Sequence, residues 1–191
     1  MKRVTCIVAG LTLFFAVLAA AQAPTAGQKL NLATGLQRSY AAMKTELTQM
    51  AEKMPDADFG FKPGTSSELR TFGQWVGHQA DNQFQNCAIL RGVANPSPAQ
   101  ANEKKMGKAV LVKALADAFA FCDSAFSALT DQSVTQMVKQ GEGETARGTV
   151  VAAMLSHGNE SSGIMTVYLR AKGISIPAGG GGRGGRGGGG Q

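Results

Sequence analysis

The chain has 191 residues and a formal net charge of +6, with 43% hydrophobic and only 6% aromatic residues. This length suits one domain with a single core. Four basic residues lie close to the two ends, Lys2, Arg3, Arg183 and Arg186, and without them the formal charge is +2. The composition therefore does not indicate a nucleic-acid-binding surface, and we expect no specific nucleic-acid partner.

Residues 1–21 have the pattern of a signal peptide. Lys2 and Arg3 precede an apolar run, Val4 to Ala20, that ends in small residues, which is the order of regions in an export signal. We expect cleavage after Ala21, since cleavage after Ala23 would leave a proline next in the chain. A membrane anchor is the alternative, but the run is short for a span and no basic segment follows it. We therefore predict a periplasmic or secreted protein without stable membrane insertion.

A first helix is predicted over residues 27–54, because its apolar residues recur in steps of three and four. Pro55 ends the pattern. The stripe consists of Ala33, Leu36, Tyr40, Met43, Leu47, Met50 and Met54.

Residues 56–70 are predicted to be irregular, and a second helix follows. Thr71 and Gln74 have the spacing of a capping box at its start, and Gly92 after Arg91 is a typical helix end. Its apolar face is formed by Phe72, Val76, Ala80, Phe84, Cys87 and Leu90.

Residues 92–107 contain two prolines and many polar residues, which indicates a long link that crosses the bundle. A third helix is predicted over residues 108–130. A polar break over residues 131–143 and a fourth helix over residues 145–172 follow, with Gly173 as the terminating glycine.

Four amphipathic helices without a convincing alternating strand predict an all-α, four-helix bundle over residues 27–177. The long link between the second and third helices suggests that these two helices run in the same direction. Residues 178–191 form a glycine- and arginine-rich tail that cannot bury apolar surface. We favour a merely flexible tail over one that binds RNA, an anionic polymer or a membrane.

Two segments resemble the DinB-like (DinB/YfiT) superfamily. The first is FGFKPGTSSELRTFGQWVGHQADNQFQNCAILRG, in which F-x-P precedes a helix that opens FGQ-x-x-GH. The second is LSHGNESSGIMTVYLRAKGI, in which H-x-N-E is followed by a Y-L-R-x-K-G ending. The resemblance extends over residues 30–177.

The resemblance implies a four-helix bundle with a crossing link between its second and third helices. It also implies a metal site with one histidine from the second helix and an H-x3-H pair from the fourth. His78 and His157 match the first two ligands, but Ser161 stands at the third position, and a serine hydroxyl is a poor ligand for Zn²⁺ or Ni²⁺. The resemblance further implies a homodimer. Thiol-transferase activity is not expected, because an exported protein does not normally meet the cytosolic thiols such relatives use.

The residues themselves leave two interpretations of the histidines open. His157 falls in an apolar stripe. It is either a core residue with a hydrogen-bond partner or a ligand or base that lines a cleft. His78 lies among polar residues, with Asp81 one turn on, where a carboxylate can orient the imidazole or coordinate a metal. Glu160 is a candidate replacement ligand or general base. No nucleophile motif accompanies them, so enzymatic activity is left open.

Cys87 and Cys122 are the only cysteines that remain after cleavage of the predicted signal peptide. Export favours a disulfide between them. Parallel second and third helices would place them at similar heights. The alternative is a pair of buried free thiols.

Two functions follow from the sequence. The first is a domain of unknown specific activity with an incomplete site for divalent Zn or Ni, formed by His78 and His157 with Glu160, Asp81 and Ser161 as accessory candidates. The second is a non-catalytic helical bundle of the cell envelope that binds an unidentified small molecule or a partner, in which the histidines are structural.

Overall fold

The computed structural model describes residues 27–175, so the predicted signal peptide and glycine-rich tail lie outside the described residues. Its main elements are four helices, α1 (Leu32–Lys53), α2 (Phe72–Arg91), α3 (Lys108–Ser127) and α4 (Arg147–Ala171). The predicted four-helix bundle is therefore confirmed. Short 3-10 turns at Asp56–Asp58 and Ser133–Thr135 lie in the connections after α1 and α3.

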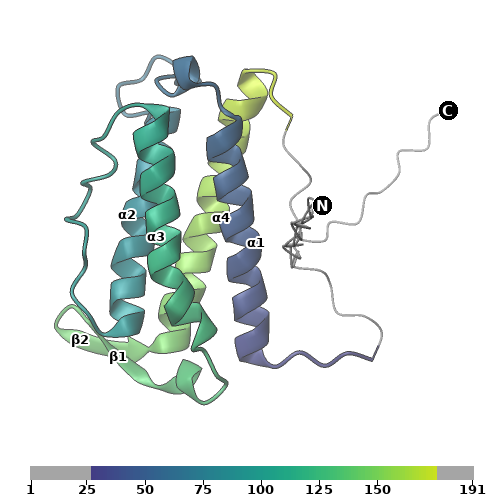
Figure 1. Cartoon of the computed structure of the whole chain (residues 1–191), viewed down its shortest axis with the longest axis vertical. Coiled ribbons are helices and arrows are strands. Elements are labelled where there is room, and N and C mark those ends of the chain that lie inside the picture. The colour runs from purple at the N-terminus through teal and green to yellow at the C-terminus, as the bar shows by residue number, and fades with distance from the viewer. Residues whose placement is uncertain (1–26, 176–191) are drawn as a thin grey trace, which may run out of the picture.

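The four helices form a ring in which α1 contacts α3, α3 contacts α2, α2 contacts α4 and α4 contacts α1. The helices α2 and α3 run in the same direction, opposite to α1 and α4 (Figure 1). This arrangement needs a link as long as the bundle, and residues 92–107 provide it along one side. The predicted parallel pair is thus confirmed.

Local chemistry explains where the helices begin and end. Asn31 caps α1 by accepting a 2.8 Å hydrogen bond from the Thr34 amide, so this helix begins at Leu32 and not at residue 27. Thr71 and Gln74 form the predicted capping box with bonds of 2.7 and 3.1 Å. Gly92 ends α2 with a φ of 64°, a left-handed conformation that favours glycine.

The segment predicted as a polar break contains a β-hairpin. Strand β1 (Met137–Gln140) pairs antiparallel with β2 (Gly143–Ala146), and Gly141 in the turn has a φ of 62°. The hairpin was not predicted because Val138 is the only buried residue in the two strands. The sequence therefore shows no alternation of apolar and polar residues here. Consequently α4 begins at Arg147, whose amide donates to the Gln136 carbonyl at 2.8 Å, and not at residue 145.

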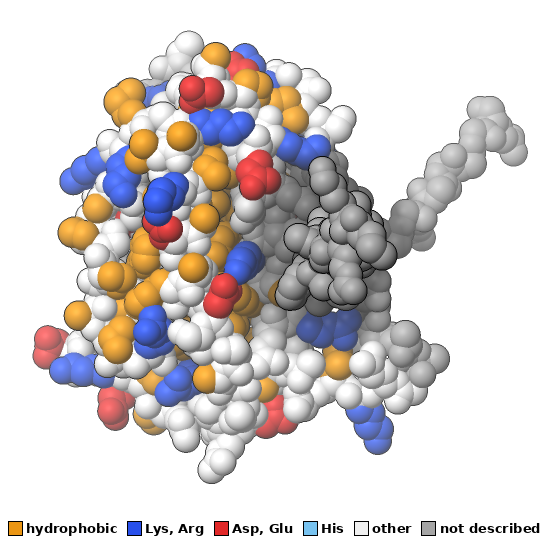
Figure 2. Space-filling view, viewed as in Figure 1, with side chains coloured by type: hydrophobic (Ala, Val, Ile, Leu, Met, Phe, Trp, Pro, Cys, Tyr) orange, Lys and Arg blue, Asp and Glu red, His pale blue; other side chains and the backbone are white. Residues whose placement is uncertain are grey.

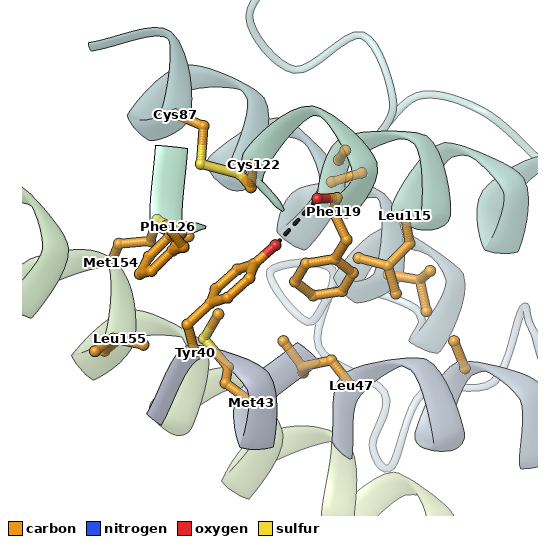
Figure 3. Packing of buried hydrophobic residues seen from close by; sticks show 14 of the residues in the cluster. Tyr40, Met43, Leu47, Cys87, Leu115, Phe119, Cys122, Phe126, Met154 and Leu155 are labelled. Carbon is orange, nitrogen blue, oxygen red and sulfur yellow. Dashed lines mark hydrogen bonds between the residues drawn. A yellow bond between two sulfur atoms is a disulfide. The ribbon is translucent and has the colours of Figure 1, made fainter. Parts of the chain in front are cut away.

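The core lies along the axis of the ring and includes nearly all of the predicted apolar stripes. Tyr40 of α1 stacks on Phe126 of α3 with ring centroids 3.8 Å apart, and its hydroxyl donates to the Phe119 carbonyl at 3.0 Å (Figure 3). Burial, and then the neighbouring Asp123 carboxylate, raise the pKa of Tyr40, so this hydroxyl stays a donor. Phe84 is an exception, because it lies at the edge of the core against Phe121.

A disulfide joins Cys87 of α2 to Cys122 of α3, as predicted, with Cα atoms 5.2 Å apart (Figure 3). The bond is compatible with the bundle because the two helices are parallel and both cysteines lie near the hairpin end. Among residues 27–175 we find no helix with the length and apolar character needed to cross a membrane.

Candidate functional site

His78 of α2 and His157 of α4 face each other across the contact between these helices. Their Nε2 atoms are 2.9 Å apart, and the two rings are nearly perpendicular with centroids 5.0 Å apart. Their side chains are 24% and 31% exposed, so the pair is half-buried and open to solvent at one side. The face formed by α3 and α1 shows no histidine, since α2 and α4 lie behind it (Figure 2). Because 31% of its side chain is exposed, His157 is not the core residue that one interpretation of the sequence suggested.

Polar bonds fix how α2 and α4 lie against each other around the pair. The Trp75 indole donates to the Tyr168 hydroxyl at 3.2 Å, and this hydroxyl donates to the Arg70 carbonyl at 2.7 Å. One turn further along α2, Gln79 Nε2 donates to the Ser161 hydroxyl at 2.6 Å. On α2 these contacts flank His78, and on α4 both lie on the C-terminal side of His157, so they fix α2 against α4 beside the histidine pair.

Glu103 of the crossing link is part of the site, and sequence reasoning missed it. Its Oε2 atom lies 3.3 Å from His78 Nδ1, and its Oε1 atom accepts a 2.6 Å bond from Arg70 Nε. The Glu103 Oε2 atom is buried and forms no hydrogen bond. Its contact with His78 is therefore an ion pair by distance and not a hydrogen bond. Glu103 lies in an irregular link, where no periodic pattern indicates which residue will meet α2.

Asp81 acts on this link and not directly on the imidazole, which corrects the expectation that it orients His78. Its carboxylate accepts from the Asn102 amide at 3.1 Å, from Asn102 Nδ2 at 2.8 Å and from the Glu103 amide at 3.0 Å. The link also lies directly on Gly77, where a Cβ atom would be 2.6 Å from the Asn102 carbonyl carbon. Asp81 and Gly77 together place Glu103 beside His78.

The two other predicted accessory residues differ in their surroundings. Glu160 lies 3.5 Å from His157 Nδ1 and is 68% exposed, so its contact is weak. Ser161 is fully buried, and its hydroxyl is bonded to Gln79. Each imidazole thus has a carboxylate on its Nδ1 side, whereas the third position of the H-x3-H pattern belongs to a buried serine–glutamine contact.

The carboxylates beside the two imidazoles determine which ring nitrogens carry protons. A carboxylate beside Nδ1 favours the tautomer in which Nδ1 carries the proton and Nε2 presents a lone pair. Two such lone pairs at 2.9 Å repel unless a proton or a cation lies between them. Burial, followed by the charge of Arg70, lowers the pKa of His78, and the Glu103 carboxylate only partly opposes this. The neutral form of His78 is therefore favoured.

The donor atoms fit a divalent cation only in part. Nitrogen ligands at ~2.0–2.1 Å from a tetrahedral ion lie about 3.3–3.4 Å apart, so a small outward shift of the two rings would suffice. Within residues 27–175, however, no group of three or more His, Cys, Asp or Glu side chains is arranged to hold a metal ion. The structure thus brings together two imidazole donors, with Glu103 and Glu160 behind them.

Comparison with protein families gives a match over most of the described chain. The model that describes the DinB superfamily matches residues 39–160, a segment that contains both histidines and ends just before Ser161. A search of the curated proteins finds no match to the chain.

Solved structures of similar fold include proteins from three bacteria. A DinB-like protein of Bacillus cereus has a TM-score of 0.60 at 14% identity, over 75% of this chain and 95% of its own. A DinB-like protein of Bacillus subtilis has a TM-score of 0.58 at 15% identity, over 75% and 96%. A conserved protein of Enterococcus faecalis has a TM-score of 0.59 at 11% identity, over 75% and 98%. At these identities the likeness concerns the fold.

Proposed function

Because the chain belongs to the DinB superfamily, we propose that His78 and His157 form a two-imidazole site for a divalent cation, Zn²⁺ or Ni²⁺. The observation that carries this proposal is the 2.9 Å separation of the two Nε2 atoms. Imidazole nitrogens are common ligands for both ions, and a site with two of them leaves coordination positions open.

The carboxylates behind the imidazoles support a metal site over a simple contact between rings. Metal-bound histidines usually give their other N–H to a carboxylate, which fixes the tautomer and raises ligand basicity. Glu103 is placed for this role, with Oε2 at the ion-pair distance of 3.3 Å from His78 Nδ1, and Arg70 and Asp81 hold it there. Glu160 lies beside Nδ1 of His157 in the same way, although its exposure to solvent weakens this contact.

Each residue of the site has a separate role in this proposal. His78 and His157 bind the ion, Glu103 orients His78, and the Gln79–Ser161 bond keeps the third position closed. A bound ion of this kind polarises oxygen ligands and lowers the pKa of coordinated water. The proposal is a metal-binding domain, and it does not assign a reaction.

The test is metal content and affinity of the tag-free mature protein. We expect about one Zn²⁺ per chain by elemental analysis, and binding by calorimetry that His78→Ala and His157→Ala each abolish. Glu103→Gln should retain binding with about 10–100-fold lower affinity, the usual effect of removing such a supporting carboxylate. Lys113→Gln, a change in an exposed ion pair of α3, serves as the control and should bind normally.

A metal-free protein whose thermal midpoint is unchanged by excess Zn²⁺ or Ni²⁺ would contradict the proposal. That result would favour the alternative, a non-catalytic bundle in which the two histidines form a structural hydrogen bond. In that case His157→Ala would lower stability without any effect of added metal.

We also propose that the protein is exported. The proposal rests on the charged and apolar pattern of residues 1–21 and on the Cys87–Cys122 disulfide, a bond typical of oxidising compartments. N-terminal sequencing of the protein from the expressing cells should show a chain that begins at Gln22 in the periplasm or medium. A full-length chain in the cytoplasm, with reduced cysteines, would contradict it.

A further inference from the structure

A groove of about 790 Å³ lies at the hairpin end of the bundle, and it is distinct from the histidine site. It is bounded by the last turn of α2, the start of the crossing link, strand β1 and the first residue of α4. Figure 1 shows the hairpin crossing below the end of α2, in the lower part of the view. His78 is 13 positions before Arg91 on α2, so the two sites are on the order of 20 Å apart along the helix.

All of the charged side chains that line the groove are basic. They are Arg91, Lys139 and Arg147, and no Asp or Glu lines it. None of the three takes part in an ion pair within the described part of the chain. Glu144 lies directly across the hairpin from Lys139, but the two form no ion pair either. The groove therefore has a local excess of positive charge that favours an anion.

Arg147 is the best placed of these groups to bind an anion. Its Nη1 donates to the Leu90 carbonyl at 2.6 Å, which anchors the guanidinium at the groove. Its Nε is buried and has no hydrogen-bond partner. An unpaired buried donor on a cation is costly, and a carboxylate accepts readily from two nitrogens on one guanidinium edge. Because Nε itself is buried, a ligand would meet Arg147 through the part of the side chain that lines the groove, where no carboxylate of the described residues pairs with its charge.

The remaining wall of the groove is largely apolar. Val93 and Met137 line it and are 48% and 57% exposed, so they are two of the few large apolar side chains left in solvent among residues 27–175. Ile89 of α2 adds a partly buried apolar surface to the same groove. A groove of this size is typical of sites for small organic molecules. An apolar chain placed here would cover side chains that are otherwise exposed to water.

We propose that this groove binds a small amphiphilic carboxylate, a carboxylate group on an unbranched apolar chain. The carboxylate lies against Arg147 and Lys139, and the apolar chain lies on Val93 and Met137. The charge of the groove favours the anion, and the exposed valine and methionine favour the chain. Neither feature alone would select this class of ligand.

The test is titration of the tag-free mature protein with decanoate, followed by calorimetry and by amide shifts in NMR spectra. We expect saturable binding of decanoate, with shifts that map to the groove. Acetate, which lacks the chain, and decyltrimethylammonium, which reverses the charge, should each bind at least about tenfold more weakly. Zn²⁺ binding at the histidine site should be unaffected by decanoate.

Variants separate the two halves of the proposal. Arg147→Gln and Lys139→Gln should each weaken decanoate binding by about tenfold, the scale of one charge-assisted hydrogen bond. Val93→Ser should weaken decanoate binding and leave acetate unchanged. Lys113→Gln removes the same charge from α3 and should bind like the wild type. Since Arg147 also holds the Leu90 carbonyl, its variant is first checked by circular dichroism, and Lys139→Gln, on the exposed hairpin, provides the independent measure.

Three results would overturn the proposal. The first is equal affinity for decanoate and decyltrimethylammonium. The second is decanoate binding that none of Arg147→Gln, Lys139→Gln and Val93→Ser changes. The third is binding to anionic lipid vesicles without binding of free decanoate, which would assign the groove to a membrane surface.

Discussion

Gln79 donates a 2.6 Å hydrogen bond to the hydroxyl of Ser161, and both side chains are fully buried between α2 and α4. Ser161 lies one helical turn after His157, at the position where the family resemblance implies a third imidazole. The Gln79–Ser161 contact thus closes the position that would complete a three-histidine set. This relationship leads to a prediction about metal affinity.

The double variant Ser161→His, Gln79→Ala should bind Zn²⁺ more tightly than the wild-type chain. The first change supplies a third nitrogen ligand, and the second removes the amide that occupies the space beside it. We expect a gain of at least about tenfold, or ~1.4 kcal/mol, by competition with a chromogenic chelator. Gln79→Ala alone is the matched control, and it should not bind more tightly than the wild type because it supplies no third nitrogen. An unchanged affinity in the folded double variant would show that residue 161 does not face the ion.

The lowered pKa of His78 predicts that the metal-free protein loses stability in mild acid. The unfolded chain takes up a proton at the ordinary histidine pKa of 6.5, whereas the folded chain resists it because of burial and Arg70. The contribution of His78 to folding is therefore present above pH 6.5 and is lost as the pH falls below it, towards the lower folded pKa.

Urea unfolding at a series of pH values, in the presence of a chelator, measures this effect. The wild type should lose stability between neutral pH and pH 5, and His78→Gln should lose less over the same interval. Parallel curves for the two proteins would contradict the prediction. Lys113→Gln controls for a change in net charge.

Removal of the disulfide should destabilise the bundle substantially. The Cys87–Cys122 bond closes a loop with a sequence separation of 35 residues, which corresponds to about 3–4 kcal/mol of stabilisation in the loop-entropy description. Cys87→Ser, Cys122→Ser should lower the free energy of unfolding by this order. A reducing agent should destabilise the wild type and leave the double variant unaffected; a double variant as stable as the oxidised wild type would show that the bond contributes little.

Gly77→Ala should displace the crossing link and disturb the histidine site. The added Cβ would lie 2.7 Å from the Glu103 Cα, and backbone atoms cannot move aside as a flexible side chain can. We expect a loss of about 1–3 kcal/mol, as for overpacking in a core, together with weaker Zn²⁺ binding because Glu103 no longer supports His78.

Gly163→Ala is the matched control for this change, since a Cβ at this α4 position would meet nothing within 4 Å beyond its chain neighbours and the adjacent backbone of its own helix. There the same substitution should be neutral or raise stability by up to about 1 kcal/mol, the difference in helix propensity. Equal effects of the two substitutions in urea unfolding would mean that contact with the link is not the cause.

Much of the fold was predictable because its signals are local. The apolar spacing around Tyr40 and Leu47 placed α1, and the Thr71–Gln74 pair placed the start of α2. The β-hairpin was missed because its strands bury only Val138, so tertiary contacts and not a visible alternation hold it at the end of the bundle. Gln79 and Gln83 were also missed as buried residues, since polar side chains in a helix give no sequence signal of burial.

Only the part of the site that lies on two helices, α2 and α4, was predictable from the sequence. Spacing along α2 and α4, with the family resemblance, indicated that His78 and His157 meet, and the structure confirms this. The same reasoning assigned Asp81 to the imidazole, because it is one turn away on the same helix, whereas Asp81 bonds to the link. The homodimer, the binding of a metal and the identity of that metal stay predictions.

The order of residues along the chain was enough to establish four helices and a parallel second and third helix, because each depends on periodicity, capping or connection length. That the two histidines meet was an expectation from the family resemblance. The roles of Glu103, Gln79 and the basic groove at Arg147 arise only on folding. They depend on which side chains of an irregular link and a short hairpin come into contact with a helix, and such contacts between distant residues leave no periodic trace in the sequence.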